Sequence, residues 1–422
     1  MRLKKGFTMK HKKLFITFTV IFSVLVALTI FFMIWFWGDR YDDFKDFRSE
    51  SAIPGLNDGA CPQGITNYRV TNTITKTDSD GNKTEIKKQD YFFISAYFKN
   101  GPSRIYVIGS ESGEIGYVTL LNTDGSDHIG HVGGIATNGR YLWVGSDDTV
   151  YVARYGKTNS DNVALDIIEK AEKHGSVKFT NSFKANCGAA FLYYYDADQN
   201  GAAGTPSASD YLYVGEFYRA GNYDTNEKHH LTTKNGETNR AFAYEYRVSN
   251  STSDDSVEAY GLYPSEGIGA ESKLAVPEIK RIFSLPDEIQ GFARTANGIV
   301  LSRSYGLKNS HIYYYSFDWN TRTENSYEIY NKIDKLGFKY DGATTKTSTA
   351  PYYDRSSSLY VYYLDRSSML NDYSIPSMSE GLCTLEGRVY VLFESGAKKY
   401  SPFVRQVLKN VYSFIPRKSE KF

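Results

Sequence analysis

Cysteine and proline are scarce in this 422-residue chain. Its three cysteines, Cys61, Cys187 and Cys383, form no CxxC pair, which excludes the usual zinc-finger and zinc-ribbon spacings. Three cysteines are too few for a disulfide scaffold, although one disulfide plus one free thiol stays open. The chain has 11 prolines against 35 glycines, which is typical of a domain with many turns and few linkers.

Net charge is also nearly absent, at +1, but the charges are unevenly distributed. Six of the 49 lysines and arginines lie in residues 1–13, which contain no acid. Residues 39–422 contain the other 43 lysines and arginines and all 48 acids. This larger part of the chain is therefore weakly acidic. A weakly acidic domain does not attract nucleic acid, and we expect no nucleic-acid partner.

One uncharged run is long enough to cross a membrane. Residues 14–37 read LFITFTVIFSVLVALTIFFMIWFW, which as a helix spans about 36 Å against a hydrocarbon layer of about 30 Å. The basic residues at 1–13 predict a cytoplasmic tail, and Trp35 and Trp37 suit a membrane interface. A cleaved signal peptide is the alternative, but its apolar region is only about 7–15 residues long and ends in small residues. We therefore predict a single-pass signal anchor in the cell membrane, a polar stalk at 38–60 and an extracytoplasmic domain at 61–422.

A glycine-marked repeat is the main feature of residues 61–422. Each copy places a glycine, or small residues around one, before an apolar run. The copies are CPQGIT (61–66), HVGGIAT (131–137), NCGAAFL (186–192), IQGFART (289–295) and MSEGLCT (378–384), registered on Gly64, Gly134, Gly188, Gly291 and Gly381. A glycine at the start of a strand permits the close backbone approach that the crowded centre of a propeller requires.

Alternating runs of about six residues follow each copy, as in YFFISAYF (91–98) and SRIYVI (103–108). This pattern predicts an all-β fold, a single β-propeller of five blades, with six as the alternative because the glycines are 54 to 103 residues apart. Residues 361–365 are predicted as a fourth strand of blade four, and 162–175 as a helical surface insertion in blade two. The chain ends in a third strand, so we expect residues near 45–60 to complete the last blade.

In combination, CPQG, HVGGIA, QGFA and MSEG…ESG resemble the repeats of a group of uncharacterised bacterial extracytoplasmic β-propeller proteins. The resemblance runs from about Cys61 to Lys399 and implies a fold but no activity. More distantly, the layout is similar to the gluconolactonase and strictosidine-synthase propellers, whose acids and amides converge on a central channel. Their metal-binding residues have no counterparts that can be assigned in this sequence.

Polar residues beside the glycines are expected around one mouth of the channel. These are Gln63, His131, Asn186, Gln290 and Glu380. Amides, an imidazole and a carboxylate together suit directional hydrogen bonding to a small polar ligand or a sugar. The structural alternative is that they bind one another, ordered water or free strand ends.

Carboxylates at this mouth make an enzyme the second hypothesis. Glu216 and Glu394 end two of the second strands, at the register of Ser95 and Arg303. With Glu380 and His131 they are candidates for acid–base catalysis in a hydrolase of sugars or lactones. Glu and Arg at such a register also form inter-blade ion pairs, which is the structural alternative.

The segment DADQNG at 196–201 resembles the first half of a calcium loop, with Asp196, Asp198 and Asn200 as oxygen donors. Ser207 stands where an EF-hand needs glutamate, and a solvated turn is the alternative. No cofactor other than calcium is expected. We predict a membrane-anchored binding or scaffolding module for a glycan, a small polar ligand or an envelope protein, with the hydrolase as alternative.

Overall fold

The computed structural model describes residues 3–37, 41–77, 81, 83–154, 162–185, 187–197, 210–249, 260–263, 277–321, 325–329 and 359–420. The chain divides into two compact units, Met1–Asp42 and Asp43–Phe422. The three-residue 3-10 helices η2 (Leu56–Asp58) and η3 (Glu227–His229) belong to the second unit, and η1 (Asp42–Asp46) spans the boundary.

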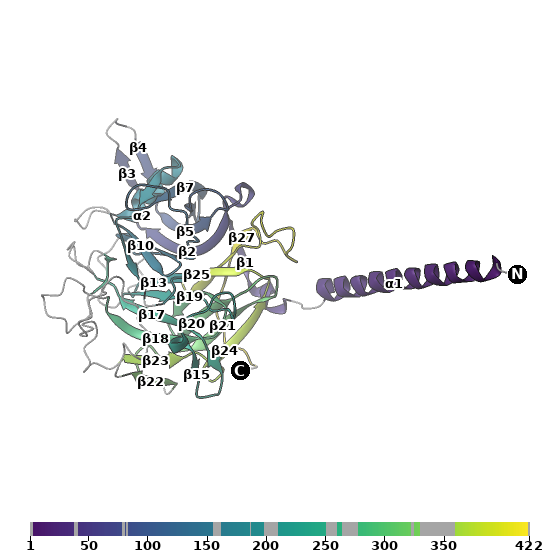
Figure 1. The fold of residues 1–422 in the computed structure, drawn as a ribbon. Helices are drawn as coiled ribbons and strands as arrows, with labels where there is room; N and C mark the ends of the chain where they lie inside the picture. Colours follow the sequence, from purple (N-terminus) through teal and green to yellow (C-terminus); the bar gives the residue numbers. More distant parts are fainter. Residues whose placement is uncertain are drawn as a thin grey trace, which may run out of the picture. The chain divides into compact units, whose positions relative to one another are not determined.

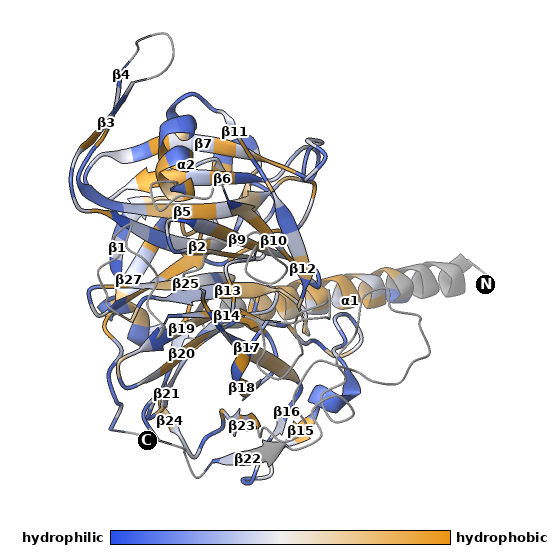
Figure 2. Ribbon diagram, turned by 90° about the vertical axis from the view of Figure 1, so that its left-hand side faces the viewer, coloured by the Kyte–Doolittle hydropathy of each residue, from blue (hydrophilic) through white to orange (hydrophobic). Residues whose placement is uncertain are grey.

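The first unit is built on helix α1 (Leu3–Trp37). Within it, the segment Leu14–Phe32 has a mean hydropathy of 2.6 and is not buried against other parts of the protein. In Figure 2 the coloured part of this helix is mostly orange, the colour of apolar residues. A helix of this length and composition can cross a membrane, and a signal sequence near an N-terminus has the same properties.

The second unit is a five-bladed β-propeller, as the repeat predicts (Figure 1). Each blade is a mainly antiparallel sheet whose first strand lies nearest the axis. Blade one contains β2 (Cys61–Val70), β5 (Gln89–Tyr97), β6 (Arg104–Gly109), β7 (Gly113–Leu121) and the parallel addition β11 (Ser176–Lys178). Blade two contains β8 (Gly134–Thr137), β9 (Tyr141–Ser146), β10 (Thr149–Arg154) and β12 (Asn181–Lys184).

Blade three is the widest sheet and carries two added strands. It contains β13 (Phe191–Tyr195), β14 (Tyr211–Gly215), β17 (Ala241–Arg247), β18 (Ile279–Leu285), β23 (Leu359–Tyr363) and β22 (Ser326–Ile329). Blade four contains β19 (Ile289–Thr295), β20 (Gly298–Arg303), β21 (Ser310–Ser316) and β24 (Met369–Ile375). Blade five contains β25 (Ser379–Leu385), β26 (Arg388–Phe393), β27 (Asn410–Phe414) and β1 (Arg48–Ala52). Two hairpins, β3 (Ile74–Thr77) with β4 (Lys83–Ile86) and β15 (Leu231–Thr232) with β16 (Thr238–Asn239), lie outside these sheets.

The five inner strands β2, β8, β13, β19 and β25 form a closed ring of neighbours. Glycine is needed where they meet. A Cβ on Gly381 would lie 2.9 Å from the carbonyl oxygen of Gln63 and from the Cα of Gly64. A Cβ on Gly134 would lie 2.3 Å from the amide nitrogen of Leu192. No side chain fits at such distances, which explains the repeated glycine.

Gly188 differs from the other four registering glycines. It lies three residues before β13, and its nearest neighbour beyond the adjoining chain is the Cβ of Glu216, at 3.2 Å from a built Cβ. On the ring, the residues of blade three that contact Gly134 are Phe191 and Leu192. The prediction that Gly188 registers the inner strand of blade three is therefore wrong, because larger residues occupy that position.

The last blade is closed by the N-terminal part of the propeller unit. Strand β1 pairs antiparallel with β27, which confirms that residues near 45–60 supply the missing outer strand. Residues 43–60 are therefore folded into the propeller, and the predicted stalk at 38–60 overlaps it. The sequence RSESA looks like a linker because an outer edge strand is largely exposed and needs few apolar residues.

Two further predictions about blade edges are corrected. Residues 361–365 are not the fourth strand of blade four, because β23 pairs in parallel with β18 of blade three. The fourth strand of blade four is β24, whose partly exposed MLNDYSI lacks a clear alternation. Helix α2 (Val163–Glu172) does form, but its apolar face is buried in the hydrophobic core of blades one and two rather than lying on the surface.

Cys61, Cys187 and Cys383 are all buried and none is in a disulfide. Burial raises the pKa of each thiol, so the thiols behave as small apolar core groups.

Candidate functional site

A cavity of about 890 Å³ opens at the mouth of the channel where the inner strands begin. Four of the five residues predicted to surround this mouth line it. These are Gln63, His131, Gln290 and Glu380. The catalytic candidates Glu216 and Glu394 line the same cavity. Asn186, the fifth predicted residue, lies outside the described residues.

Three of these side chains are placed by the same irregularity in the backbone. The ladders β2–β5 and β19–β20 each have one extra residue on the inner strand, at Gln63 and at Gln290. The β25–β26 ladder shifts in the same way between Ser379 and Leu382, across Glu380. A β-bulge re-aims a side chain that regular pairing would direct elsewhere. The repeated Gln-Gly and Glu-Gly dipeptides therefore bring each polar residue to the cavity and leave the glycine at the ring contact.

Glu380 and Glu394 form a carboxyl pair in the wall between blades five and one. Their side chains are hydrogen-bonded to each other. Burial and the neighbouring Glu394 carboxylate raise the pKa of Glu380 well above its ordinary value. Burial raises the pKa of Glu394 to about 7, opposed by the Gln63 hydrogen bond and by Lys399. A hydrogen bond between two carboxyl groups requires a proton on at least one of them, so this pair carries at most one negative charge near neutral pH.

Gln63 holds the pair in place, and two tyrosines and a lysine lie near it. The Gln63 amide donates to Glu394 over 2.9 Å and also to the carbonyl oxygen of Pro62. The Tyr97 and Tyr400 hydroxyls lie 3.3 Å apart, and Lys399 donates to Tyr97. Cys61 is buried beside this group. Gln63 is therefore a structural residue as well as a lining one.

Glu216 is fully engaged within the protein. Its carboxylate lies 2.5 Å from Nδ1 of the buried His229 and accepts hydrogen bonds from the main-chain amides of Phe242 and Gly188. The His229 contact attaches η3 to blade three. Because both oxygens of Glu216 are in use, the structure supports its role as a buried anchor of this loop.

His131 and Gln290 are not engaged in this way. The ring nitrogens of His131 and the side-chain amide of Gln290 have no hydrogen-bond partner among the described residues. The His131 ring stacks on Tyr97 with centroids 4.4 Å apart. The surrounding cavity wall displaces water from the imidazole, and this desolvation lowers the pKa of His131. The nearby Asp147 carboxylate has the opposite, smaller effect on that pKa. A neutral imidazole offers a ligand one donor and one acceptor, and a free amide offers two N–H donors and a carbonyl acceptor.

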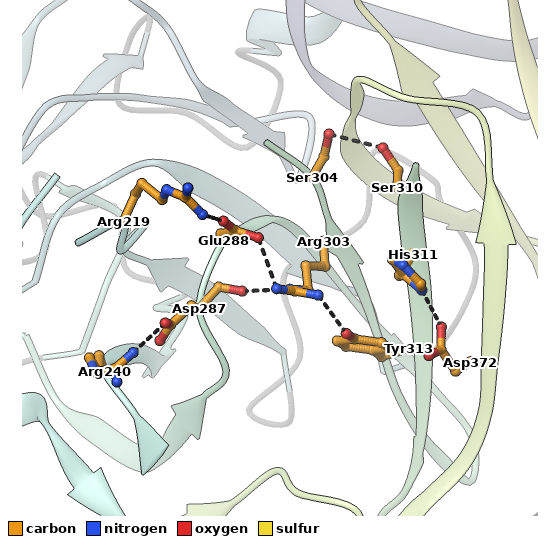
Figure 3. A network of polar contacts seen from close by, with 10 residues as sticks. All are labelled: Arg219, Arg240, Asp287, Glu288, Arg303, Ser304, Ser310, His311, Tyr313 and Asp372. Carbon is orange, nitrogen blue, oxygen red and sulfur yellow. Dashed lines mark hydrogen bonds and ion pairs between the residues drawn. The ribbon is translucent and has the colours of Figure 1, made fainter. Parts of the chain in front are cut away.

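Arg303 has the register of Ser95, Glu216 and Glu394 but belongs to a separate ion-pair network (Figure 3). Its guanidinium donates to Glu288 at 2.9 Å, to the Tyr313 hydroxyl and to the carbonyl oxygen of Asp287. Glu288 also pairs with Arg219, and Asp287 pairs with Arg240. This network joins the strands and loops of blades three and four, which matches the structural alternative for this register.

Backbone strain is concentrated at the same mouth. Six described residues other than glycine have a positive φ, and four of them, Val132, Asp147, Glu288 and Met378, lie in loops at this end of the propeller. Asp147 and Met378 line the cavity. Such conformations cost about 1–3 kcal/mol each and are typical of functional sites.

The predicted calcium site is described only at Asp196, because Asp198 and Asn200 lie outside the described residues. Asp210, on the other side of that segment, accepts hydrogen bonds from the Tyr194 hydroxyl and the Ala197 amide. The calcium site therefore stays a prediction.

No protein-family model and no curated protein matches the sequence. Among solved structures, the chain is similar to a candidate 6-phosphogluconolactonase of Bacteroides uniformis, with a TM-score of 0.22 and 9% identity over 61% of this chain and 80% of that one. It is also similar to Sqt1 of Saccharomyces cerevisiae (TM-score 0.25, 8% identity, 89% and 90% covered). A third is Hsv2 of Kluyveromyces marxianus (TM-score 0.23, 6% identity, 80% and 91% covered). These TM-scores are too low to support a conclusion about this chain.

Proposed function

We propose that the propeller is a binding module for a small, hydroxyl-rich polar ligand such as a glycan unit, held in the channel-mouth cavity. The observation that carries the proposal is the position of His131 and Gln290 on the wall of one cavity, with polar atoms that no described residue uses. Free donors and acceptors at an enclosed surface suit a ligand whose hydroxyl groups need partners once water leaves. The partly exposed rings of Phe217 and Tyr305 add apolar wall.

The carboxyl pair supports binding rather than glycoside hydrolysis. A glycosidase holds its two carboxyl groups about 5–9.5 Å apart so that the scissile bond lies between them. The Glu380 and Glu394 side chains are hydrogen-bonded to each other, which is closer than this separation. Glu216, the third candidate, has both oxygens occupied by protein donors. Neither feature of these three candidate glutamates favours the hydrolase alternative.

The test is a binding measurement on the full chain in detergent with neutral oligosaccharides, by isothermal titration. We expect Gln290→Ala and His131→Ala each to weaken binding by about tenfold, since each removes hydrogen bonds to the ligand. Ile415→Ala, an exposed position at the end of β27, is the matched control. Equal affinities in Gln290→Ala and the control, or no binding of any oligosaccharide, would overturn the proposal.

A protein partner, such as another envelope protein, is a second candidate because of exposed apolar residues on the cavity face. Large exposed hydrophobic residues of the described propeller lie mostly in the loops at this end. They are Ile129, Tyr223, Leu307, Phe403 and Val407, whereas Ile415 lies elsewhere. Exposed apolar side chains gathered on one face are typical of an interaction surface. A photo-crosslinker at Phe403 should then capture a specific protein in cells, and one at Ile415 should not.

A further inference from the structure

We infer that the ligand of the channel-mouth cavity carries a protonated amine, with the Asp147 carboxylate as its main anchor. This inference rests on the proposed binding function and adds the charge of the ligand to it. Three independent features of the cavity wall support it: its charge balance, the state of Asp147 and its aromatic rings.

The wall is strongly acidic. It includes six carboxyl groups, those of Asp147, Asp148, Glu216, Asp224, Glu380 and Glu394. Among the described lining residues, Lys184 is the one lysine or arginine, and its ammonium group is bound to Asp148 at 2.6 Å. Even with one proton shared by Glu380 and Glu394 and with Lys399 beside them, the wall keeps a negative balance. A negative concave surface attracts a cation and disfavours an anion.

Asp147 is held in place by its main chain, while its side chain stays available on the cavity. It has a positive φ of 56° in the tight turn between β9 and β10, and its carbonyl oxygen accepts a 2.6 Å hydrogen bond from the amide of Ala189. Its main chain is therefore fixed to the neighbouring blade. Its carboxylate is exposed on the cavity and receives no hydrogen bond from the described residues. A strained, fixed residue with an unused charge is what a ligand anchor requires.

Aromatic rings on the same wall already bind cations within this chain. The Arg219 guanidinium carbon lies 4.5 Å from the centroid of Tyr305, and Lys399 lies 4.7 Å from that of Tyr400. Tyr223 is 57% exposed, contacts Phe217 edge to face at 5.4 Å and has no such cation over it among the described residues. Carboxylate and aromatic face together form the usual receptor for an organic ammonium group.

The geometry favours an organic cation over a metal ion. In the part of the chain that the structure describes, no group of three His, Cys, Asp or Glu side chains comes close enough to hold a metal. An ammonium group needs fewer ligands, since one carboxylate and one ring face give it both charge and contact. The amine can belong to an amino sugar or to a polyamine, and the experiment separates these sources.

The experiment compares three probes by isothermal titration on the full chain in detergent at about pH 6. The probes are fully deacetylated chitotetraose, its fully acetylated counterpart and spermine. We expect the deacetylated form to bind at least about tenfold more tightly than the acetylated form, and its affinity to fall with salt. Asparagine tolerates a positive φ, so Asp147→Asn should keep the turn intact. The variant should reduce the preference for the deacetylated form about tenfold. Glu111→Gln, which removes a carboxylate at an exposed position that does not line the cavity, is the matched control.

The outcomes separate this inference from the proposed function. Equal binding of the acetylated and deacetylated forms would overturn the amine and leave the proposed function standing. Binding of spermine alone, lost in Asp147→Asn, would support the amine and overturn the hydroxyl-rich ligand. No binding of any probe at about millimolar concentration would overturn both. Unchanged affinity for the deacetylated form in Asp147→Asn would overturn the anchor.

Discussion

The side-chain amide of Gln63 donates a 2.9 Å hydrogen bond to the carboxylate of Glu394, although the two residues are 331 positions apart in the sequence. Gln63 belongs to the first blade and Glu394 follows the second strand of the last one, so the bond crosses the seam where the propeller closes. Glu394 is bonded in turn to Glu380. The candidate site and the closure of the ring therefore share the same residues.

Replacing Gln63 should destabilise the protein. Gln63→Leu leaves the Glu394 carboxylate without its amide donor in a mostly buried place, which costs about 1–3 kcal/mol in the free energy of unfolding. Gln290→Leu is the control, since the Gln290 amide has no partner among the described residues and should cost less than about 0.5 kcal/mol. Urea unfolding near pH 7 measures both. Similar losses in the two variants would contradict a role for Gln63 in the seam.

The carboxyl pair should make stability depend on pH between about 4.5 and 8. The pKa of Glu394 is raised to about 7 and that of Glu380 is raised well above its ordinary value, so the folded state binds more protons than the unfolded state above about pH 4.5. The stabilisation is complete below that pH and is lost as the pH rises through about 7.

Glu380→Gln should flatten this dependence, because it removes one charge and keeps the shape. We expect the variant to gain on the order of 1–3 kcal/mol relative to the wild type between pH 5 and pH 8, measured by thermal or urea unfolding. Glu111→Gln, at an exposed position, is the control. A wild-type stability that rises with pH over this range would show that the two acids are ionised in the folded state.

Phe47 should be essential for closing the propeller. Its ring stacks on Phe414 with centroids 4.4 Å apart and meets Tyr373 edge to face, and 7% of the residue is exposed. Phe47→Ala should cost about 3–5 kcal/mol in the free energy of unfolding, the usual loss for a buried aromatic residue. Phe403→Ala, at a phenylalanine that is 62% exposed, should cost almost nothing. Equal stabilities would mean that residues 43–52 do not secure the last blade.

The inner-strand glycines should differ in their tolerance of alanine. In Gly381→Ala the new Cβ would lie 2.9 Å from main-chain atoms of Gln63, Gly64 and Ile65, which cannot move without opening the ring. We expect a loss of at least about 1–3 kcal/mol by thermal unfolding. In Gly188→Ala the nearest atom is a side-chain carbon at 3.2 Å, and the loss should be smaller. A larger loss of stability in Gly188→Ala than in Gly381→Ala would show that Gly188 does occupy a ring position.

The N-terminal helix is proposed to anchor the propeller outside the cell. Its apolar segment and the basic residues before it predict an uncleaved single span with a cytoplasmic tail. Protease added to intact cells should then degrade the propeller unit and leave a membrane-bound N-terminal fragment, while a propeller on the cytoplasmic side would be protected. Recovery of a soluble form that begins after Trp37 would instead identify a cleaved signal sequence.

Much of the site could be found from the sequence because the repeat marks it. Gln63, Gln290 and Glu380 each stand before a glycine at the start of an apolar run, and the structure places all three on one cavity. His131 was found from the same repeat, two residues before a glycine. Asp147 was missed as a site residue, since a turn sequence such as SDDT gives no sign that the loop faces a cavity. Tyr223 was missed because its loop lies outside the repeat.

By itself, the sequence determined the apolar helix, the five strand groups and the small residues at the ring, because each depends on local hydrophobicity or size. Tertiary structure alone decided that β23 joins β18, that Gly188 is off the ring and that Glu394 meets Glu380. An alternating pattern records which face of a strand is buried but not which strand lies beside it. The protonation of two glutamates likewise depends on their distance in space, which a separation of 14 positions along the chain does not reveal.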